Sequence, residues 1–433
     1  MTAASLVVAS VVVLLGGICF FRLPIGMLLA LIGFAGYALL DGTGTAVSMA
    51  GNEFWSTFSG TGLTVVPLFV FMGQICFHSG LSGRLYAAVS SWMGHKRGGV
   101  AAATLAACGA FAAICGSNTA TAATMSAVSL PEMKSRGYRP AFAAGVVAAG
   151  TTLGAVIPPS VVAIILGIQT QLSIRKLFIG GIMPGILLLL LFIGSIALLA
   201  KYKPKLVPAG PKADLRERMR ALPGLMEAAL LFFLVVGGLG IGAFTPTEAG
   251  AAGSVLALLI GVARRSLSPA KIGRAVFETM NVSAMIFLLL AGAGCYGKFL
   301  ALSRTPFMVA QWVEGLHMAP AAVLLLIFAV YLVGGMLMDA LALLLITMPI
   351  FYPLIVDMGV DPLWFCLVLL VVTTMGAVTP PVGASAYVVA SMGKISLSDV
   401  FRGTMLFIPA FILCILLMAL FPGAVLFLPD LIH

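Results

Sequence analysis

One stretch occurs twice in this sequence: GTTLGAVIPPS at residues 150–160 and VTTMGAVTPPV at residues 372–382. Seven of the eleven positions are identical, and the copies lie 222 residues apart in a chain of 433. Each copy sits inside an apolar segment, residues 141–170 and 363–391, and each contains adjacent prolines, which lack the backbone N–H and interrupt a helix. We therefore predict an internal duplication in which each half contains a discontinuous helix with an unwound centre.

The composition places this duplication in a membrane. Hydrophobic residues make up 61% of the chain and charged residues only 9%, whereas soluble globular proteins have about 25% charged residues. Apolar runs of about 17 to 25 residues recur along the whole length, which favours spanning helices over the short alternating strands of a membrane barrel. We predict an all-α polytopic membrane protein. Its net charge of +10 does not indicate a nucleic-acid partner, because in membrane proteins charge marks the sides of the bilayer.

Two further apolar segments are interrupted by small or polar residues. Residues 98–131 contain no charge, but their centre reads GSNTATAAT, and basic residues flank both ends. A re-entrant helical hairpin that enters and leaves on the same side fits this pattern, and two short straight spans remain the alternative. Residues 319–352 repeat the arrangement around GGMLMDA (334–340), with acidic residues at their flanks. We predict a second re-entrant hairpin there, with its ends on the opposite side.

The positions of the basic residues orient the chain. With both hairpins re-entrant, 20 of the 24 Lys and Arg residues lie on one side, including seven in a polar loop at residues 201–220. The positive-inside rule makes this side cytoplasmic. Residues 1–200 and 221–433 then form two repeats of inverted topology. No basic residue precedes Arg22, so we expect a periplasmic N-terminus.

Non-helical backbone at membrane depth must line a cavity or be buried in protein. We therefore expect each hairpin tip to meet the broken helix of its own half. Hydroxyl, amide, carboxylate and free carbonyl oxygens suit Na⁺, and the N-termini of half-helices suit a carboxylate. Asp339 is the one ionisable residue of the second hairpin and is expected to serve as an ion ligand or proton carrier, with a structural role as the alternative. The residues expected to meet are Ser117, Asn118, Thr119 and Thr121 with Thr151, Thr152, Gly154 and Pro158, and Gly334, Gly335 and Asp339 with Thr373, Thr374, Gly376, Thr379 and Pro380.

Enzyme classes find no support in the sequence. H-E-x-x-H, G-x-S-x-G and P-loop motifs do not occur, so neither metal-dependent hydrolysis, serine hydrolysis nor ATP hydrolysis is expected. Duplicated hairpins and broken helices are typical of alternating-access carriers. An anion channel, or a carboxylate carrier of the DASS type that works without a binding protein, remains the alternative.

Four motifs in this order resemble the large membrane subunit of tripartite ATP-independent periplasmic (TRAP) transporters: GSNTATAATMSAVSLPEMKSRGY, GTTLGAVIPPS, FTPTEAGA and TTMGAVTPPVG. The resemblance implies a Na⁺-driven importer of the bacterial inner membrane that works by an elevator movement. It also implies two partners, a separate small four-helix membrane subunit and a periplasmic substrate-binding protein. Substrates in such a family are C4-dicarboxylates, sialic acid and other organic acids, and no cofactor is expected besides the coupling ion.

The resemblance also assigns residues. Helices within residues 4–41 and 222–263 would form a scaffold, and the hairpins with the broken helices would form the moving transport domain. The second hairpin tip lacks the Ser-Asn-Thr pattern of the first. The implied first Na⁺ site comprises Ser117, Asn118, Gly154 and Pro158, the second Gly335, Asp339, Thr374, Gly376 and Thr379, and the substrate contacts Thr119, Thr121, Thr152, Pro159, Pro380 and Pro381.

Overall fold

The computed structural model describes residues 3–17, 23–210, 214–315 and 318–431. Arg22 and Lys212, two of the residues used to orient the chain, lie outside these ranges. Every regular secondary-structure element of the described residues is a helix, and their one β-bridge, between Arg97 and Ala209, belongs to no strand. The prediction of an all-α protein is confirmed.

Many of these helices have the length and composition of membrane spans. Eight helical segments of the described chain are long and apolar enough to cross a bilayer, and a ninth results if the bent pair α21 and α22 counts as one span. The eight are Thr61–His78, Pro140–Thr170, Ile174–Tyr202, Leu215–Gly240, Pro246–Ala263, Pro269–Leu302, Pro320–Leu337 and Ala340–Asp357.

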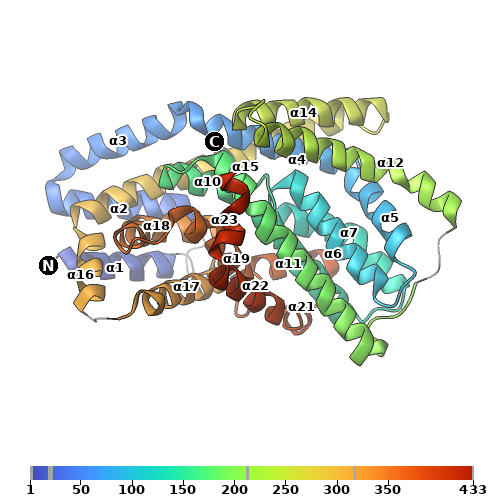
Figure 1. Ribbon diagram of the computed structural model, residues 1–433. Helices are drawn as coiled ribbons and strands as arrows, with labels where there is room; N and C mark the ends of the chain where they lie inside the picture. Colours follow the sequence, from blue (N-terminus) through green and yellow to red (C-terminus); the bar gives the residue numbers. More distant parts are fainter. Residues whose placement is uncertain (1–2, 18–22, 211–213, 316–317, 432–433) are drawn as a thin grey trace. The chain divides into compact units, whose positions relative to one another are not determined.

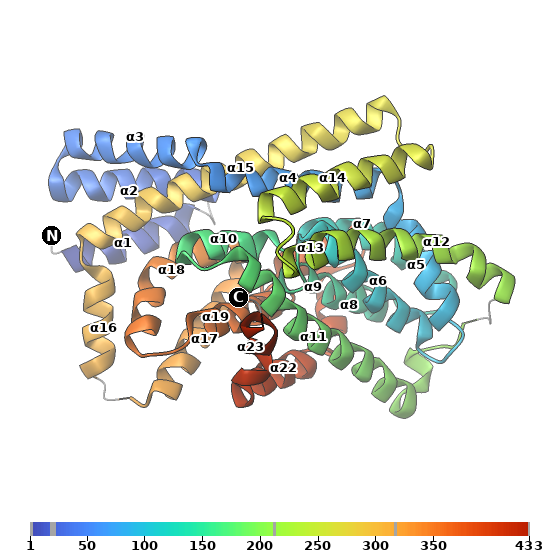
Figure 2. The same ribbon diagram turned by 45° about the horizontal axis from the view of Figure 1, so that its top comes forward.

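The chain forms two compact units. Unit 1 contains the residues up to Pro67 together with Met280–Val330 and Leu341–Pro362. In it α2, α3 and part of α15 lie side by side (Figure 2). A Cβ on Gly26 would lie 2.7 Å from the backbone nitrogen of Leu289, so α2 and α15 touch backbone to backbone. Its elements are α1 (Ala3–Gly16), α2 (Ile25–Asp41), α3 (Thr43–Ser59), η2 (Thr61–Thr64), α16 (Thr305–Gly315) and most of α15 (Pro269–Leu302), α17 (Pro320–Leu337) and α18 (Ala340–Asp357).

Unit 2 contains Leu68–Thr279, Tyr331–Ala340 and the chain from Leu363 onward. Its helices α6 and α7 lie side by side, joined by a short turn (Figure 1). Its elements are most of α4 (Val65–His78), α5 (Leu81–Met93), α6 (Gly99–Cys115), α7 (Asn118–Ser135), α8 (Pro140–Thr151), α9 (Leu153–Val156), α10 (Val161–Thr170), α11 (Ile174–Tyr202), η3 (Pro204–Leu206), α12 (Leu215–Phe232), the π-helix η4 (Phe233–Gly237), α13 (Gly238–Gly240), α14 (Pro246–Ala263), the start of α15, the end of α17, most of α19 (Pro362–Gly376), α20 (Ala384–Gly393), α21 (Leu397–Thr404), α22 (Ile408–Leu420) and α23 (Pro422–Asp430).

The core of unit 2 is the interrupted helix α8–α9–α10, whose apolar window is 94% buried. Because no side of it faces solvent, this segment is apolar all round and shows no polar stripe. α21 crosses α8 where Gly145 and Gly403 meet, and a Cβ on either glycine would overlap the backbone of the other helix. The crossing thus joins a helix of the first half to one of the second.

Two helices of unit 1 were not predicted. α3 (TGTAVSMAGNEFWSTFS) contains Asn52 and Glu53 and is largely exposed, and α16 is short. Both carry too much polar or small-residue sequence to be recognised as apolar spans. Their helical state is therefore not visible in a search for long hydrophobic runs.

Candidate functional site

The first hairpin loses helical structure within its predicted tip GSNTATAAT, and the first broken helix loses it at the proline pair of the repeated motif. α6 ends at Cys115, Gly116 takes a left-handed conformation with φ of 65°, and α7 begins at Asn118. Ser117 caps α7, since its Oγ accepts a hydrogen bond from the backbone nitrogen of Ala120 at 3.4 Å. In the broken helix, α9 ends at Val156 and α10 begins at Val161.

This tip and this break are in direct contact. The backbone nitrogen of Val161 donates a hydrogen bond to the carbonyl of Gly116 at 3.1 Å. A Cβ on Gly154 would lie 3.0 Å from the carbonyl oxygen of Ser117 and 3.1 Å from Oδ1 of Asn118. The structure therefore brings together Ser117, Asn118 and Gly154. The N-termini of α7 and α10 meet at the same place, and both ends carry partial positive charge.

Asn118 supplies an oxygen with unused hydrogen-bonding capacity. Its Oδ1 is buried and has no hydrogen-bond partner within the described chain. Such an acceptor costs free energy unless a donor or a cation satisfies it. Among the described residues no group of three or more His, Cys, Asp or Glu side chains is placed to hold a metal ion. A cation here would thus rely on amide, hydroxyl and carbonyl oxygens, the ligands that hard cations prefer.

The second junction repeats this geometry. α17 ends at Leu337 and α18 begins at Ala340, so the half-buried Asp339 lies in the turn directly before the N-terminus of α18. A Cβ on Gly376 would lie 2.8 Å from the Cα of Gly335. The backbone nitrogen of Gly383 donates to the carbonyl of Met336 at 3.0 Å. Gly376 and Gly383 are the repeat equivalents of Gly154 and Val161. Their partners Gly335 and Met336 lie in the last turn of α17, whereas the corresponding partners in the first half lie in the turn between α6 and α7.

The predicted threonines lie at these junctions and use their hydroxyl hydrogens locally. Thr152 Oγ1 donates to the carbonyl of Ala149 at 2.6 Å, Thr374 Oγ1 to that of Val371 at 2.9 Å and Thr379 Oγ1 to that of Met375 at 2.6 Å. Their oxygens therefore keep lone pairs for a ligand. In the first tip, Thr119 is exposed and Thr121 is fully buried.

The two proline pairs differ in environment. Pro158 and Pro159 are buried, whereas Pro380 is exposed together with Pro381. Both Pro–Pro peptide bonds are cis. The predicted substrate contacts at these pairs thus have unequal access to solvent, which the sequence motif alone does not indicate.

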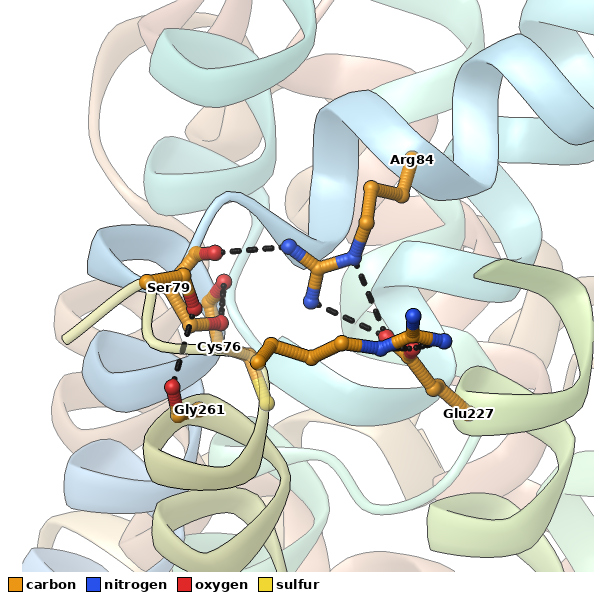
Figure 3. A network of polar contacts seen from close by, with 7 residues as sticks. Cys76, Ser79, Arg84, Glu227 and Gly261 are labelled. Atoms are coloured by element: carbon orange, nitrogen blue, oxygen red, sulfur yellow. Dashed lines mark hydrogen bonds and ion pairs between the residues drawn. The ribbon is translucent and has the colours of Figure 1, made fainter. Parts of the chain in front are cut away.

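A third polar cluster was not predicted (Figure 3). Glu227 on α12 is 10% exposed and accepts hydrogen bonds from Arg84 Nε and Nη2, at 3.1 and 2.9 Å, and from Arg264 Nε at 2.6 Å. Arg84 also donates to the carbonyl of Ser79 at 2.8 Å. The cluster ties α5, α12 and the end of α14 together. A single acidic residue inside an apolar segment was the available signal, but its partners lie 143 and 37 positions away.

These features match a known family. The model of the tripartite ATP-independent periplasmic transporter, DctM component, matches residues 11–424. The chain belongs to this family. It is therefore a TRAP transporter large permease, a multi-pass membrane protein, and its relatives are permeases rather than enzymes.

Several characterised relatives are similar over most of the permease. It is 32% identical to the C4-dicarboxylate TRAP transporter large permease DctM of Pseudomonas aeruginosa, over 85% of this chain and 86% of that one. It is 30% identical to the sialic acid TRAP transporter large permease SiaM of Vibrio cholerae, over 96% of each. The isethionate TRAP transporter permease DctMQ of Oleidesulfovibrio alaskensis is 34% identical over 84% of this chain, which spans 57% of that longer protein.

A solved structure shares the fold. The YdaH transporter of Alcanivorax borkumensis superposes with a TM-score of 0.64 over 88% of this chain and 89% of its own, at 15% sequence identity. At this identity the likeness concerns the fold alone.

Proposed function

We propose that this permease imports a small organic acid together with Na⁺ across the bacterial inner membrane. The observation that carries the proposal is the duplicated junction, in which a hairpin tip and a broken helix meet backbone to backbone in each half. Irregular backbone within apolar segments is tolerated where it lines a site, and half-helix N-termini there attract an anion. The substrate class follows from the relatives, which are named for C4-dicarboxylate, sialic acid and isethionate transport.

The coupling ions belong at the two junctions in this proposal. In the first, Ser117 and Asn118 supply side-chain oxygens and the backbone around Gly154 and Pro158 supplies carbonyls. The buried, unpartnered Oδ1 of Asn118 supports this placement, because a bound cation would satisfy it. The substrate carboxylate then lies beside the ions, near the N-termini of the half-helices.

The second ion site combines Asp339 and Thr374 with the backbone of Gly335, Gly376 and Thr379. Asp339 directly precedes α18, where a carboxylate is also stabilised by the helix N-terminus. Na⁺ bound at both tips holds each tip against its break, so that substrate is bound only when the ions are present. No cofactor besides the ion takes part.

The transport movement follows from treating both hairpins as re-entrant. The two halves, residues 1–200 and 221–433, are then inverted repeats, the hairpins and broken helices form a transport domain, and helices within 4–41 and 222–263 form the scaffold. The transport domain slides along the scaffold and carries the site across the bilayer. The basic residues, including the loop 201–220, face the cytoplasm, and the N-terminus lies in the periplasm.

The permease works with two partners in this proposal. A small membrane subunit, separate from this chain, binds the scaffold, and a periplasmic binding protein delivers the substrate. Two facts support these partners. The family is described as a tripartite periplasmic transporter, and this chain spans only 57% of the relative named DctMQ.

Reconstitution tests the proposal. The permease is placed in proteoliposomes with its small subunit, and uptake of labelled succinate, sialic acid and isethionate is measured with and without binding protein and Na⁺ gradient. Saturable uptake that needs both is expected. Conductance without binding protein would instead establish an anion channel. Saturable uptake without binding protein would establish a carboxylate carrier of the DASS type. Asp339→Asn should weaken the Na⁺ dependence, and an unchanged Na⁺ dependence removes Asp339 from the mechanism.

A further inference from the structure

The first broken helix is covered closely by α11. A Cβ on Gly181 would lie 2.6 Å from the carbonyl oxygen of Val156, and a Cβ on Gly185 would lie 2.5 Å from Cγ1 of Ile157. All residues from 151 to 160 are buried. This break is therefore closed on the side of α11, although its backbone is as irregular as that of the second.

The second broken helix opens into a pocket of about 510 Å³ within unit 2. Its remaining wall comes from α21, and it is apolar apart from one hydroxyl and one guanidinium. The pocket is a shallow hollow, largely open on one side. The lining residues are Pro380, Pro381, Leu397, Ser398, Phe401, Arg402 and Met405.

The helices that cover the two breaks are repeat equivalents. ISLSDVFRGT (395–404), which ends with α21, aligns at an offset of 223 with LSIRKLFIGG (172–181), which leads into α11. Ser173 and Ser396 correspond and both cap their helices, with Oγ accepting from a backbone nitrogen at 3.4 and 3.1 Å. Arg402 then corresponds to Ile179, which is 6% exposed. A buried apolar position in the first half is thus a cation in the second.

Arg402 is available for a ligand. Its side chain is 77% exposed, and its one charged neighbour in the described chain is Asp399, at 3.5 Å. The carboxylate of Asp399 also accepts a hydrogen bond from Ser396 Oγ at 2.7 Å and does not line the pocket. The guanidinium of Arg402 donates no hydrogen bond within the described chain, so its donors can bind the planar oxyanion that they match best.

We propose that this pocket binds the transported organic acid, with Arg402 contacting its carboxylate or sulfonate and the Pro380–Pro381 wall contacting its less polar body. The inference rests on the proposed function for the statement that the ligand is the substrate. Because the pocket wall is apolar apart from this one cation and one hydroxyl, it selects acids that present a single anionic group to Arg402. Arg402 is therefore a specificity residue that only the second half carries.

Thiol labelling tests the anion site without transport. In Ser398→Cys, the reaction rate with the anionic reagent sulfonatoethyl methanethiosulfonate is divided by the rate with its cationic trimethylammonium counterpart. The ratio should fall roughly tenfold when Arg402→Gln is added, because a unit positive charge beside the thiol is lost. Protein without Ser398→Cys gives the background labelling by the native cysteines. This background should be low, because the six cysteines of the described chain are buried. An unchanged ratio overturns the site.

Arg136→Gln is the matched control, because Arg136 also pairs with an acidic residue nearby in sequence, Glu132, but does not line the pocket. It should leave the labelling ratio unchanged. In the uptake assay, with the acid that the wild type transports, Arg402→Gln should raise KM about tenfold or more with a smaller effect on Vmax, and Arg402→Lys should recover part of the loss. Equal KM values for wild type and Arg402→Gln overturn the role in substrate binding.

The two proposals fail separately. Anion-selective labelling through Arg402 in a protein without Na⁺-dependent uptake contradicts the proposed function alone. Intact Na⁺-dependent uptake with no effect of Arg402→Gln on labelling or KM contradicts this inference alone.

Discussion

Replacing Gly376 with alanine tests the second junction directly. The new Cβ would lie 2.7 Å from the carbonyl oxygen of Leu332 and 2.8 Å from the Cα of Gly335, whereas ordinary contact begins near 3.4 Å. The backbones must therefore separate by about 0.7 Å, the difference between 3.4 and 2.7 Å. Overpacking of this kind costs about 1–3 kcal/mol. We expect Gly376→Ala to lower the unfolding temperature by about 1–3 °C, because the shift is this free energy divided by the entropy of unfolding, which is large for a chain of 433 residues.

The repeat equivalent and an exposed glycine calibrate this effect. Gly154→Ala meets its nearest atoms at 3.0 Å, so the first tip needs to move by only about 0.4 Å and the loss of stability should be smaller. A Cβ on Gly194 in α11 would have no packing neighbour within 4 Å, so alanine there should be neutral or stabilise the helix by up to about 1 kcal/mol.

Thermal unfolding of the purified permease in detergent, followed by intrinsic fluorescence with and without Na⁺, separates the three variants. The expected order of stability is Gly194→Ala, then Gly154→Ala, then Gly376→Ala. If Na⁺ binds at the junctions, its stabilising effect should shrink in the two junction variants and persist in Gly194→Ala. Wild-type stability of Gly376→Ala would refute the close approach from which the magnitude was derived.

Three further predictions concern named contacts. Glu227→Gln should cost about 2–3 kcal/mol, below the ~3–5 kcal/mol of a fully buried ion pair, because its arginine partners are partly exposed. Glu132→Gln, whose carboxylate is 34% exposed against 10% for Glu227, should cost under about 1 kcal/mol in the same denaturation assay, and equal losses would argue against the cluster. Thr404→Val removes the 2.9 Å hydrogen bond to the carbonyl of Val378 and should lower stability by about 1 kcal/mol in that assay. Asn118→Ala should raise the Na⁺ concentration for half-maximal uptake about tenfold, and an unchanged value would exclude its Oδ1 as a ligand.

Much of the fold was predictable because membrane helices leave a strong signal. A long apolar run without charge has few alternatives to a helix, and adjacent prolines end it wherever they occur. The repeated motif therefore located the breaks before Val161 and after Gly376. The contact between tip and break was also predictable, since irregular backbone in an apolar segment has to line a cavity or be buried in protein.

The remaining features depend on contacts between distant residues. Glu227 pairs with Arg84 and Arg264, and neither arginine shows its role in its local sequence. The exposure of Pro380 depends on what covers it, and the same motif is buried in the first half. The sequence of α3 differs from that of a loop only by a weak helical periodicity of its apolar residues. Pairings and exposures of this kind are set by packing, which a local motif does not encode.

The crossing of Gly145 and Gly403 limits how this permease can be recombined. Each glycine lies against the backbone of the other helix, and the two residues belong to different halves of the duplicated chain. A chimera that joins the first half of one relative to the second half of another has to keep a glycine at both positions. A larger residue at either one would push the halves apart, so the two halves can diverge in sequence only while this pair is retained together.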